Sequence, residues 1–239
     1  MLLKGRKALI TGAGGALGSE IAKAFQEEGA EVLGVDRKQT DFVVYCDITD
    51  ESSVRSVFGQ AEMAGNVTDV VHTAGVVSCG LLSDLSKSDF ENVINVNLIG
   101  SFLVARQAVN SFSKLESIIF ISSQAGLKSA ALWSAYSASK AGVLRICEAL
   151  AQEVGPRGIR VNAVCPGNIE SPMMDDSISA VSLLRQKKPL DVTKKYLDDI
   201  PLNRFARPAE IASVCVFLAS PMASYVSGSS YVVDGGELS

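Results

Sequence analysis

The sequence contains a single histidine, His72, among its 239 residues. One imidazole excludes a His-rich metal site, and it excludes a Ser-His-Asp triad unless His72 itself serves in it. The cysteines are widely spaced and form no C-x-x-C pair: Cys46, Cys79, Cys147, Cys165 and Cys215. We therefore expect neither a disulfide framework nor a bound metal, and we interpret the cysteines as small buried hydrophobic residues.

Basic blocks and long apolar runs are also absent. The chain carries 22 Lys+Arg against 26 Asp+Glu, a net charge of −4. Nucleic acid and anionic membranes are therefore not expected as partners. No apolar run approaches the roughly 18 residues of a membrane helix, and glycines interrupt the N-terminal segment before a signal peptide could form. We expect a cytoplasmic protein in a reducing environment.

Short apolar runs, rich in β-branched residues, alternate with longer amphipathic stretches. Several runs lack clean alternation of apolar and polar residues, which is typical of strands buried on both faces of a parallel sheet. The predicted strands are Lys7–Thr11, Glu31–Val35, Phe42–Tyr45, Asp69–His72, Ser117–Ile121, Arg160–Val164 and Ser230–Val233. Helical patterns cover Ala16–Glu28, Ser137–Val154 and Pro208 to about Ala219. The sequence predicts one domain, residues 1–239, with an α/β fold: a Rossmann-type, doubly wound parallel sheet of seven strands with helices on both faces.

Two segments depart from this even alternation. Only about ten residues separate Asp36 from Asp47, so a full crossover helix hardly fits there. The stretch 168–203 interrupts the pattern with mixed polar and apolar residues and with Pro172 and Pro201. A segment of this kind inside a compact domain is more often an active-site lid than filler, so we expect a substrate lid over residues 168–203.

The strand Lys7–Thr11 leads directly into the segment GAGGALG, residues 12–18, and then into a helix. Glycines let the backbone turn tightly and approach a pyrophosphate at the N-terminus of that helix. The strict G-x-G-x-x-G pattern is not met, because Leu17 occupies the position of its third glycine. Since a strand precedes the turn and a helix follows it, the segment predicts a dinucleotide site.

Asp36 ends the second predicted strand, where its charge bears on the choice of cofactor. A carboxylate at this position accepts hydrogen bonds from the adenosine ribose hydroxyls and repels a 2′-phosphate. Arg37 and Lys38 follow and could instead bind that phosphate, but solvated surface is the simpler interpretation of these two side chains. No basic residue occurs within residues 13–17. We therefore expect NAD, with NADP less favoured.

Tyr136 and Lys140 stand four residues apart in a predicted helix and therefore share one face. An ammonium beside a phenol favours the phenolate, so we expect Lys140 to lower the pKa of Tyr136 toward neutral pH. Such a phenol is a competent acid and base. A pair with this spacing is common on helix surfaces, so further residues are needed to interpret it.

With these residues in place, the chain resembles the short-chain dehydrogenase/reductase family, in its compact single-domain branch, over essentially its whole length. Residues 11–18 match the family's T-G-x-x-x-[AG]-x-G turn. Glycines 12, 15 and 18 also fit the T-G-x-x-G-x-x-G spacing of the epimerase-like branch, which the length and later motifs decide against. Asp47 matches the acid near the adenine ring. Residues 72–75, HTAG, replace the usual N-N-A-G, so His72 is interpreted as a structural residue at a strand end.

Further matches carry the chemistry. Asn97, in VNLIG, matches the catalytic asparagine, and Ser123 precedes Tyr136 as the family's catalytic serine does, with Ser122 as its structural neighbour. Residues 166–171, PGNIES, match the P-G-x-I-x-T segment beside the nicotinamide, and residues 234–236 match the V-D-G-G ending. The predicted catalytic residues are Asn97, Ser123, Tyr136 and Lys140. The predicted cofactor site consists of Gly12, Gly14, Gly15, Leu17, Gly18, Asp36, Asp47, Ile48, Thr73, Ala74, Gly75, Tyr136, Lys140, Pro166, Gly167, Ile169 and Ser171.

The resemblance implies hydride transfer between a nicotinamide and a secondary alcohol or ketone of a small molecule. Tyr136 would exchange the hydroxyl proton, and Lys140 would lower its pKa and hold the nicotinamide ribose. Ser123 would hydrogen-bond the substrate oxygen, and Asn97 would position a water linking Lys140 to solvent. The family is commonly tetrameric, which implies a homotetramer, or a dimer, formed through the helix of about Ser134–Val154, the long helix before it and Val226–Val233.

Other interpretations remain open. The chain could be an NADP-dependent 3-oxoacyl-thioester reductase, or a dinucleotide-binding regulator without catalysis, although such proteins typically lose the Tyr or the Lys. Basic side chains of the lid could attract an acidic substrate or form the solvated face of two short helices: Arg185, Lys187, Lys188, Lys194 and Lys195. Four apolar side chains could line a substrate pocket or belong to core and subunit packing: Leu127, Trp133, Met173 and Met174.

Overall fold

The structure, a computed structural model, describes residues 1–40 and 43–239. Its parallel strands form one seven-stranded sheet in the order β3-β2-β1-β4-β5-β6-β7, which confirms the expected fold class. The strands are β1 (Lys7–Thr11), β2 (Glu31–Asp36), β3 (Val43–Tyr45), β4 (Asp69–His72), β5 (Ser117–Ile121), β6 (Arg160–Pro166) and β7 (Ser230–Val233). The predicted strand boundaries agree with those in the structure to within about two residues. Phe42, placed at the start of the third predicted strand, lies outside the described residues.

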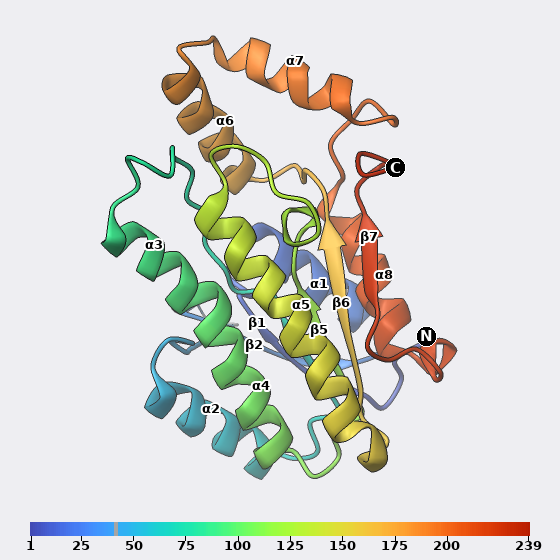
Figure 1. Cartoon of the computed structure of the whole chain (residues 1–239). Coiled ribbons are helices and arrows are strands. Elements are labelled where there is room, and N and C mark those ends of the chain that lie inside the picture. Colours follow the sequence, from blue (N-terminus) through green and yellow to red (C-terminus); the bar gives the residue numbers. More distant parts are fainter. Residues whose placement is uncertain (41–42) are drawn as a thin grey trace.

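Helices cover both faces of the sheet (Figure 1). One face packs against α2 (Glu51–Met63), α4 (Gly100–Ser111) and α5 (Ser134–Val154). The other packs against α1 (Ala16–Glu27) and α8 (Pro208–Ala219). A further helix, α3 (Lys87–Ile94), continues through a π-helical turn, Asn95–Ile99, into α4. No helix lies within residues 37–40, in agreement with the short spacing after Asp36.

The buried strand β5 shows why its sequence lacks polar alternation. Ile118 and Phe120 face the core under α2, α4 and α5, whereas Ile119 and Ile121 face the core under α1 and α8. Successive side chains of a strand point to opposite faces, and here both faces are covered. All five residues of β5 are therefore buried.

The chain changes direction across the sheet at β1. This strand pairs with β2 on one side and with β4 on the other, with Thr11 opposite His72. Such a switch point leaves a crevice at the carboxyl ends of the two strands, where α/β proteins bind their ligands. The glycine-rich turn after β1 and residues 73–75 after β4 meet at this point.

The predicted lid contains two helices, α6 (Pro172–Arg185) and α7 (Pro189–Asp199). Figure 1 shows them beyond the carboxyl end of β6, away from the helices that cover the sheet. They enclose a small core of Ile178, Val181 and Val192. Within residues 1–40 and 43–239, no helix combines the length and hydropathy needed to cross a bilayer.

Candidate active site

The turn between β1 and α1 depends on two glycines. Gly12 has φ +71°, and a Cβ added there would lie 2.6 Å from the backbone nitrogen of Ala74. A Cβ at Gly18 would collide with the carbonyl oxygen of Gly12. Gly15 caps α1 without a side-chain hydrogen bond, so the amides of the first turn remain available to an anion. This cradle fits the pyrophosphate of a dinucleotide.

Asp36 lies at the end of β2, beside the same turn. Its carboxylate accepts hydrogen bonds from the amide of Gly14 at 3.2 Å and from the amide of Lys38 at 2.9 Å. The side chains of Arg37 and Lys38 are exposed. The negative charge is therefore fixed at the glycine-rich turn, while the two cations point into solvent around it.

Asp47 and Ile48 follow β3 and serve the local structure. Asp47 accepts hydrogen bonds from the amide and the hydroxyl of Thr49, at 2.9 and 2.7 Å. Ile48 is buried and contacts α4 so closely that a Cβ at Gly100 would lie 2.7 Å from its Cδ1 atom. The side chains thus hold the turn before α2.

The segment after β4 is tied to β1. Thr73 donates its hydroxyl to the carbonyl oxygen of Thr11 at 2.7 Å, and the Thr11 hydroxyl lies 2.7 Å from Nδ1 of His72. His72 is fully buried, and burial, with the nearby charge of Lys140, lowers its pKa to about 3. The imidazole is therefore neutral and sits at a strand end, as expected, and its Nε2 atom has no partner.

Asn97 lies in the π-helical turn between α3 and α4. Its side chain makes two hydrogen bonds of 2.8 Å with the backbone of Val76 and donates a third to Ser139 at 3.0 Å. A Cβ at Gly75 would lie 3.2 Å from Oδ1 of Asn97 and 3.5 Å from Nζ of Lys140. Asn97 and Lys140 therefore approach one another at Gly75.

Ser123 and Tyr136 form a hydrogen-bonded pair. Ser123 is the second residue after β5 and has an extended backbone conformation. Its hydroxyl also accepts a hydrogen bond from the amide of Ala125 at 3.1 Å. Tyr136 lies in the first turn of α5 and is half-buried. Ser122 donates its hydroxyl to the carbonyl of Lys140 at 2.9 Å, which fastens α5 to the end of β5.

The electrostatics of this pair correct one expectation. Burial raises the pKa of Tyr136, and the hydrogen bond with Ser123 offsets only part of that shift, so the expected lowering by Lys140 was wrong. Lys140 lies over the tyrosine ring, with Nζ 5.7 Å from the ring centroid, and donates to the carbonyl of Ile121 at 2.9 Å. Burial lowers the pKa of Lys140 itself to about 8. The helical spacing indicated the shared face but not the atom that the ammonium contacts.

Residues 166–171 follow β6 and border the same end of the sheet. A Cβ at Gly167 would lie 2.9 Å from Cα of Asp234, so only glycine fits between the two segments. Ile169 pairs with Ala206, and Ser171 caps α6 by accepting the amide of Met174. The predicted residues of this segment thus connect the sheet to the first lid helix.

Two features of the site were not predicted from the sequence. The Gln124 side chain hydrogen-bonds Glu237, which also accepts the side-chain amide of Asn168 at 3.2 Å. Leu132 has φ +80°, a conformation rare for a bulky side chain, and its carbonyl accepts the amide of Gly80 at 2.9 Å. Neither the long-range contact nor the backbone conformation has a local sequence signal.

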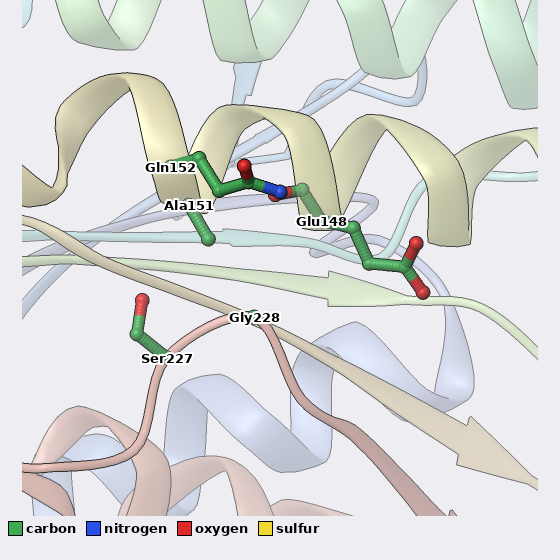
Figure 2. A pocket seen from close by; sticks show the side chains of 5 residues that line it. All are labelled: Glu148, Ala151, Gln152, Ser227 and Gly228. Atoms are coloured by element: carbon green, nitrogen blue, oxygen red, sulfur yellow. The ribbon is translucent and has the colours of Figure 1, made fainter.

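One surface pocket lies elsewhere on the molecule. It measures about 390 Å³, opens to solvent, and is lined by Glu148, Ala151, Gln152, Ser227 and Gly228 (Figure 2). These residues lie near the carboxyl end of α5, far along the helix from Tyr136, and include one ionisable side chain. The pocket therefore lacks the groups that the chemistry requires. Among the described residues, no cluster of His, Cys, Asp and Glu is placed to hold a metal ion.

Comparison with known proteins connects this geometry to a family. Residues 12–237 match the family model described as enoyl-(acyl carrier protein) reductase. The chain is 35% identical to the 3-oxoacyl-[acyl-carrier-protein] reductase FabG of Thermotoga maritima, over 99% of both proteins. It is 31% identical to 2-(S)-hydroxypropyl-CoM dehydrogenase 3 of Xanthobacter autotrophicus, over 98% of this chain and 97% of the relative.

Solved structures agree. Levodione reductase superposes with a TM-score of 0.91 and 28% identity over 98% of each chain. The aldohexose dehydrogenase of Thermoplasma acidophilum gives 0.89 and 28% identity, covering 99% of this chain and 95% of that one. The chain belongs to the short-chain dehydrogenase/reductase family. It is an NAD(P)-dependent oxidoreductase that acts on small molecules through a nicotinamide cofactor.

Proposed function

We propose that this protein transfers a hydride between NAD(H) and a secondary alcohol or ketone of a small molecule, with Asn97, Ser123, Tyr136 and Lys140 as its catalytic residues. The observation that carries the proposal is the hydrogen-bonded pair of Ser123 and Tyr136 with the buried Lys140 amine over the tyrosine ring. A hydroxyl donor beside a phenol serves a substrate oxygen that must lose or gain a proton.

Each side chain has one task. The nicotinamide, when bound, accepts or supplies the hydride. Tyr136 takes the proton from the substrate hydroxyl during oxidation and returns it during reduction. Ser123 orients the substrate oxygen and stabilises developing negative charge on it. Lys140 supplies positive charge and a proton path, and Asn97 positions the water that links this amine to solvent.

The cofactor site extends across the switch point between β1 and β4. The uncapped first turn of α1 holds the pyrophosphate, with Gly12, Gly14, Gly15, Leu17 and Gly18 around it. Asp36 favours NAD over NADP, because its fixed carboxylate accepts the ribose hydroxyls and repels a 2′-phosphate. The remaining cofactor residues lie at the ends of neighbouring strands: Asp47, Ile48, Thr73, Ala74, Gly75, Pro166, Gly167, Ile169 and Ser171.

A second candidate is reduction of a 3-oxoacyl thioester on an acidic carrier. The similarity to the 3-oxoacyl-[acyl-carrier-protein] reductase of Thermotoga maritima favours it. Arg185, Lys187 and Lys188 are exposed at the tip between α6 and α7 and could meet an acidic partner. If this activity is the true one, neutralising the three cations raises KM for the carrier-bound substrate and leaves KM for a free ketone unchanged.

The lid, the assembly and the location belong to the same proposal. We assign residues 168–203 as a substrate lid over a single domain. Exposed apolar side chains support association into a homotetramer or a dimer: Ile99 just before α4, Phe102 within it, and Val232 in β7. The free cysteines fit a reducing, cytoplasmic setting.

The experiment is a steady-state assay of nicotinamide absorbance with a panel of cyclic and acidic secondary alcohols. NAD and NADP are compared, and Tyr136→Phe serves as the inactive variant, with Tyr225→Phe as the matched control at an exposed tyrosine. Removing the phenol should lower kcat by about 10² to 10⁴-fold, the usual contribution of general acid–base catalysis. Full turnover by Tyr136→Phe would refute the mechanism. Cofactor binding without turnover on a broad panel would favour the regulator.

A further inference from the structure

The C-terminal turn after β7 is fixed in place. The Asp234 carboxylate accepts the amides of Gly236 and Leu238, each at 2.9 Å. Gly235 has φ +69°, its carbonyl accepts the amide of Leu202 at 3.2 Å, and a Cβ there would lie 2.8 Å from Cγ2 of Ile200. Residues 234–238 are therefore held against the segment that leaves the lid helix α7.

This turn presents the Glu237 carboxyl to two amide side chains. Asn168 donates to Oε2 of Glu237 at 3.2 Å, and Gln124 hydrogen-bonds the same carboxyl. Gln124 directly follows Ser123. Its Oε1 atom is buried without a partner and lies 3.2 Å from the position of a Cβ on Gly167. The two amides orient Glu237 from the segments that flank the proposed reacting centre.

The lid contributes the other neighbours of this carboxyl. Tyr196 of α7 interacts electrostatically with Glu237, Cys79 and Arg185. Burial raises the pKa of Glu237, and among its neighbours Asp234 and Asp199 act in the same direction while Lys195 acts against them. The cation that acts on Glu237 is already engaged, because Lys195 forms an ion pair with Asp199 on α7.

Apolar side chains make up the rest of this region. Trp133, Met174, Tyr196 and Phe205 pack on the small core beneath the lid. A mostly apolar surface with a few convergent polar groups is typical of small-molecule sites. Glu237 is linked to this surface through its interaction with Tyr196. It keeps free acceptor positions, since a carboxylate has about four lone-pair positions and the two amides occupy only part of them.

We infer that Glu237 anchors the substrate by accepting a hydrogen bond from a second donor group, a hydroxyl or an ammonium, on a molecule with an apolar body. The inference rests on the proposed function, which places the reacting carbon at Tyr136. The preferred substrates are therefore diols, hydroxyketones or amino alcohols built on a compact hydrocarbon frame, and a simple alcohol of the same frame binds more weakly.

The test measures binding, so it does not depend on turnover. Isothermal titration of the protein with NADH compares cyclohexanol with the 1,3- and 1,4-cyclohexanediols and with 4-aminocyclohexanol. At least one bifunctional ligand should bind about ten-fold or more tightly than cyclohexanol, the effect expected for a hydrogen bond to a charged group. The diol and amino alcohol arms distinguish a hydroxyl from an ammonium.

Three variants decide the assignment. Glu237→Ala should reduce the binding preference for the bifunctional ligand over cyclohexanol to less than about two-fold. The isosteric Glu237→Gln should weaken this preference while the fold is kept. Asp198→Ala, which removes an exposed lid carboxylate, should leave the preference unchanged.

Equal binding of all ligands, no binding of any, or a preference that survives Glu237→Ala would overturn the inference. With NAD and the same panel, a binding preference without turnover would refute the proposed function alone, and turnover without a preference would refute the anchor alone.

Discussion

The Nζ atom of Lys140 lies 5.7 Å from the centre of the Tyr136 ring and donates its hydrogen bond to the carbonyl oxygen of Ile121. The amine thus joins the end of β5 to the first turns of α5. Because both groups are desolvated, burial raises the pKa of the phenol and lowers the pKa of the amine to about 8. Tyr136 is therefore protonated near pH 7, which is the form that donates a proton during reduction, and it must release this proton before it accepts one during oxidation. The amine beside it is mostly protonated.

The buried amine lowers the stability of the fold. A shift of the Lys140 pKa from 10.5 to about 8 corresponds to about 3 kcal/mol at neutral pH. Lys140→Met removes this penalty but leaves the Ile121 carbonyl without its hydrogen bond, which reduces the gain in stability by about 1 kcal/mol. The variant should thus be inactive yet more stable than the wild type by about 1–3 kcal/mol at pH 7 in urea unfolding.

The gain from Lys140→Met should depend on pH. The folded pKa lies below the unfolded one, so the penalty on the wild type is complete below about pH 8 and disappears as pH rises toward about 10. Lys188→Met, at an exposed lysine, should show no such trend. A gain that does not change with pH would contradict the assignment of the penalty to a buried charge.

His72 should make the fold sensitive to acid. Its pKa is lowered to about 3 by burial, so protonation favours the unfolded chain, and stability should fall as pH decreases below about 6.5. His72→Asn should remain active and should lose less stability over this range, by up to about 1.4 kcal/mol for each pH unit. Unfolding curves of the two proteins between pH 7 and pH 4 provide the measurement. Parallel curves would show that the imidazole is not held neutral.

Asp36 should control the choice of cofactor. Asp36→Ala removes the carboxylate that faces the amide of Gly14 and leaves Arg37 and Lys38 in place. We expect kcat/KM with NAD to fall and kcat/KM with NADP to rise, changing their ratio by about 10² or more, because an anion at the 2′-phosphate position is removed and two cations remain. Asp84→Ala, at an exposed carboxylate, is the control. An unchanged ratio would place cofactor selection elsewhere.

Two glycines provide a matched pair for the dinucleotide turn. Gly18→Ala introduces a methyl group against the carbonyl of Gly12 and should abolish cofactor binding or folding. Gly59→Ala, in α2, meets nothing within 4 Å and should stabilise the protein by about 0.5–1 kcal/mol through helix propensity. Fluorescence titration with NADH and urea unfolding measure the two effects. Normal cofactor binding by folded Gly18→Ala would refute the close approach.

Strands were predictable because both faces of the sheet are covered. A run such as Ile118–Ile121 is apolar throughout, without alternating polar residues, and its length and flanking turns suffice to identify it as a strand. The end of β6 extends beyond the prediction to Pro166, because the neighbouring strand β7 continues the ladder there. Pairing of this kind depends on distant segments.

The placement of the candidate residues was predictable where they are close in sequence or belong to a motif. Ser123, Tyr136 and Lys140 lie on two consecutive elements, and the structure brings them together. The contact of Gln124 with Glu237 depends on how β5, β6 and β7 lie side by side, which no local pattern encodes. The direction of the Tyr136 pKa shift was missed because burial of the phenol outweighs its hydrogen bond with Ser123, and helical spacing does not reveal that burial.

The central claim is that hydride transfer between the substrate carbon and the nicotinamide depends on proton transfer by Tyr136. It is tested most directly by following the hydrogen atom on that carbon. Secondary alcohols of the panel, deuterated at the carbinol carbon, are incubated with NAD and the protein, and the reduced cofactor is analysed by mass spectrometry. We predict that one deuterium per turnover reaches the nicotinamide with the wild type and that Tyr136→Phe, with cofactor still bound, transfers essentially none. An unlabelled cofactor with the wild type, or equal labelling by both proteins, would contradict the account.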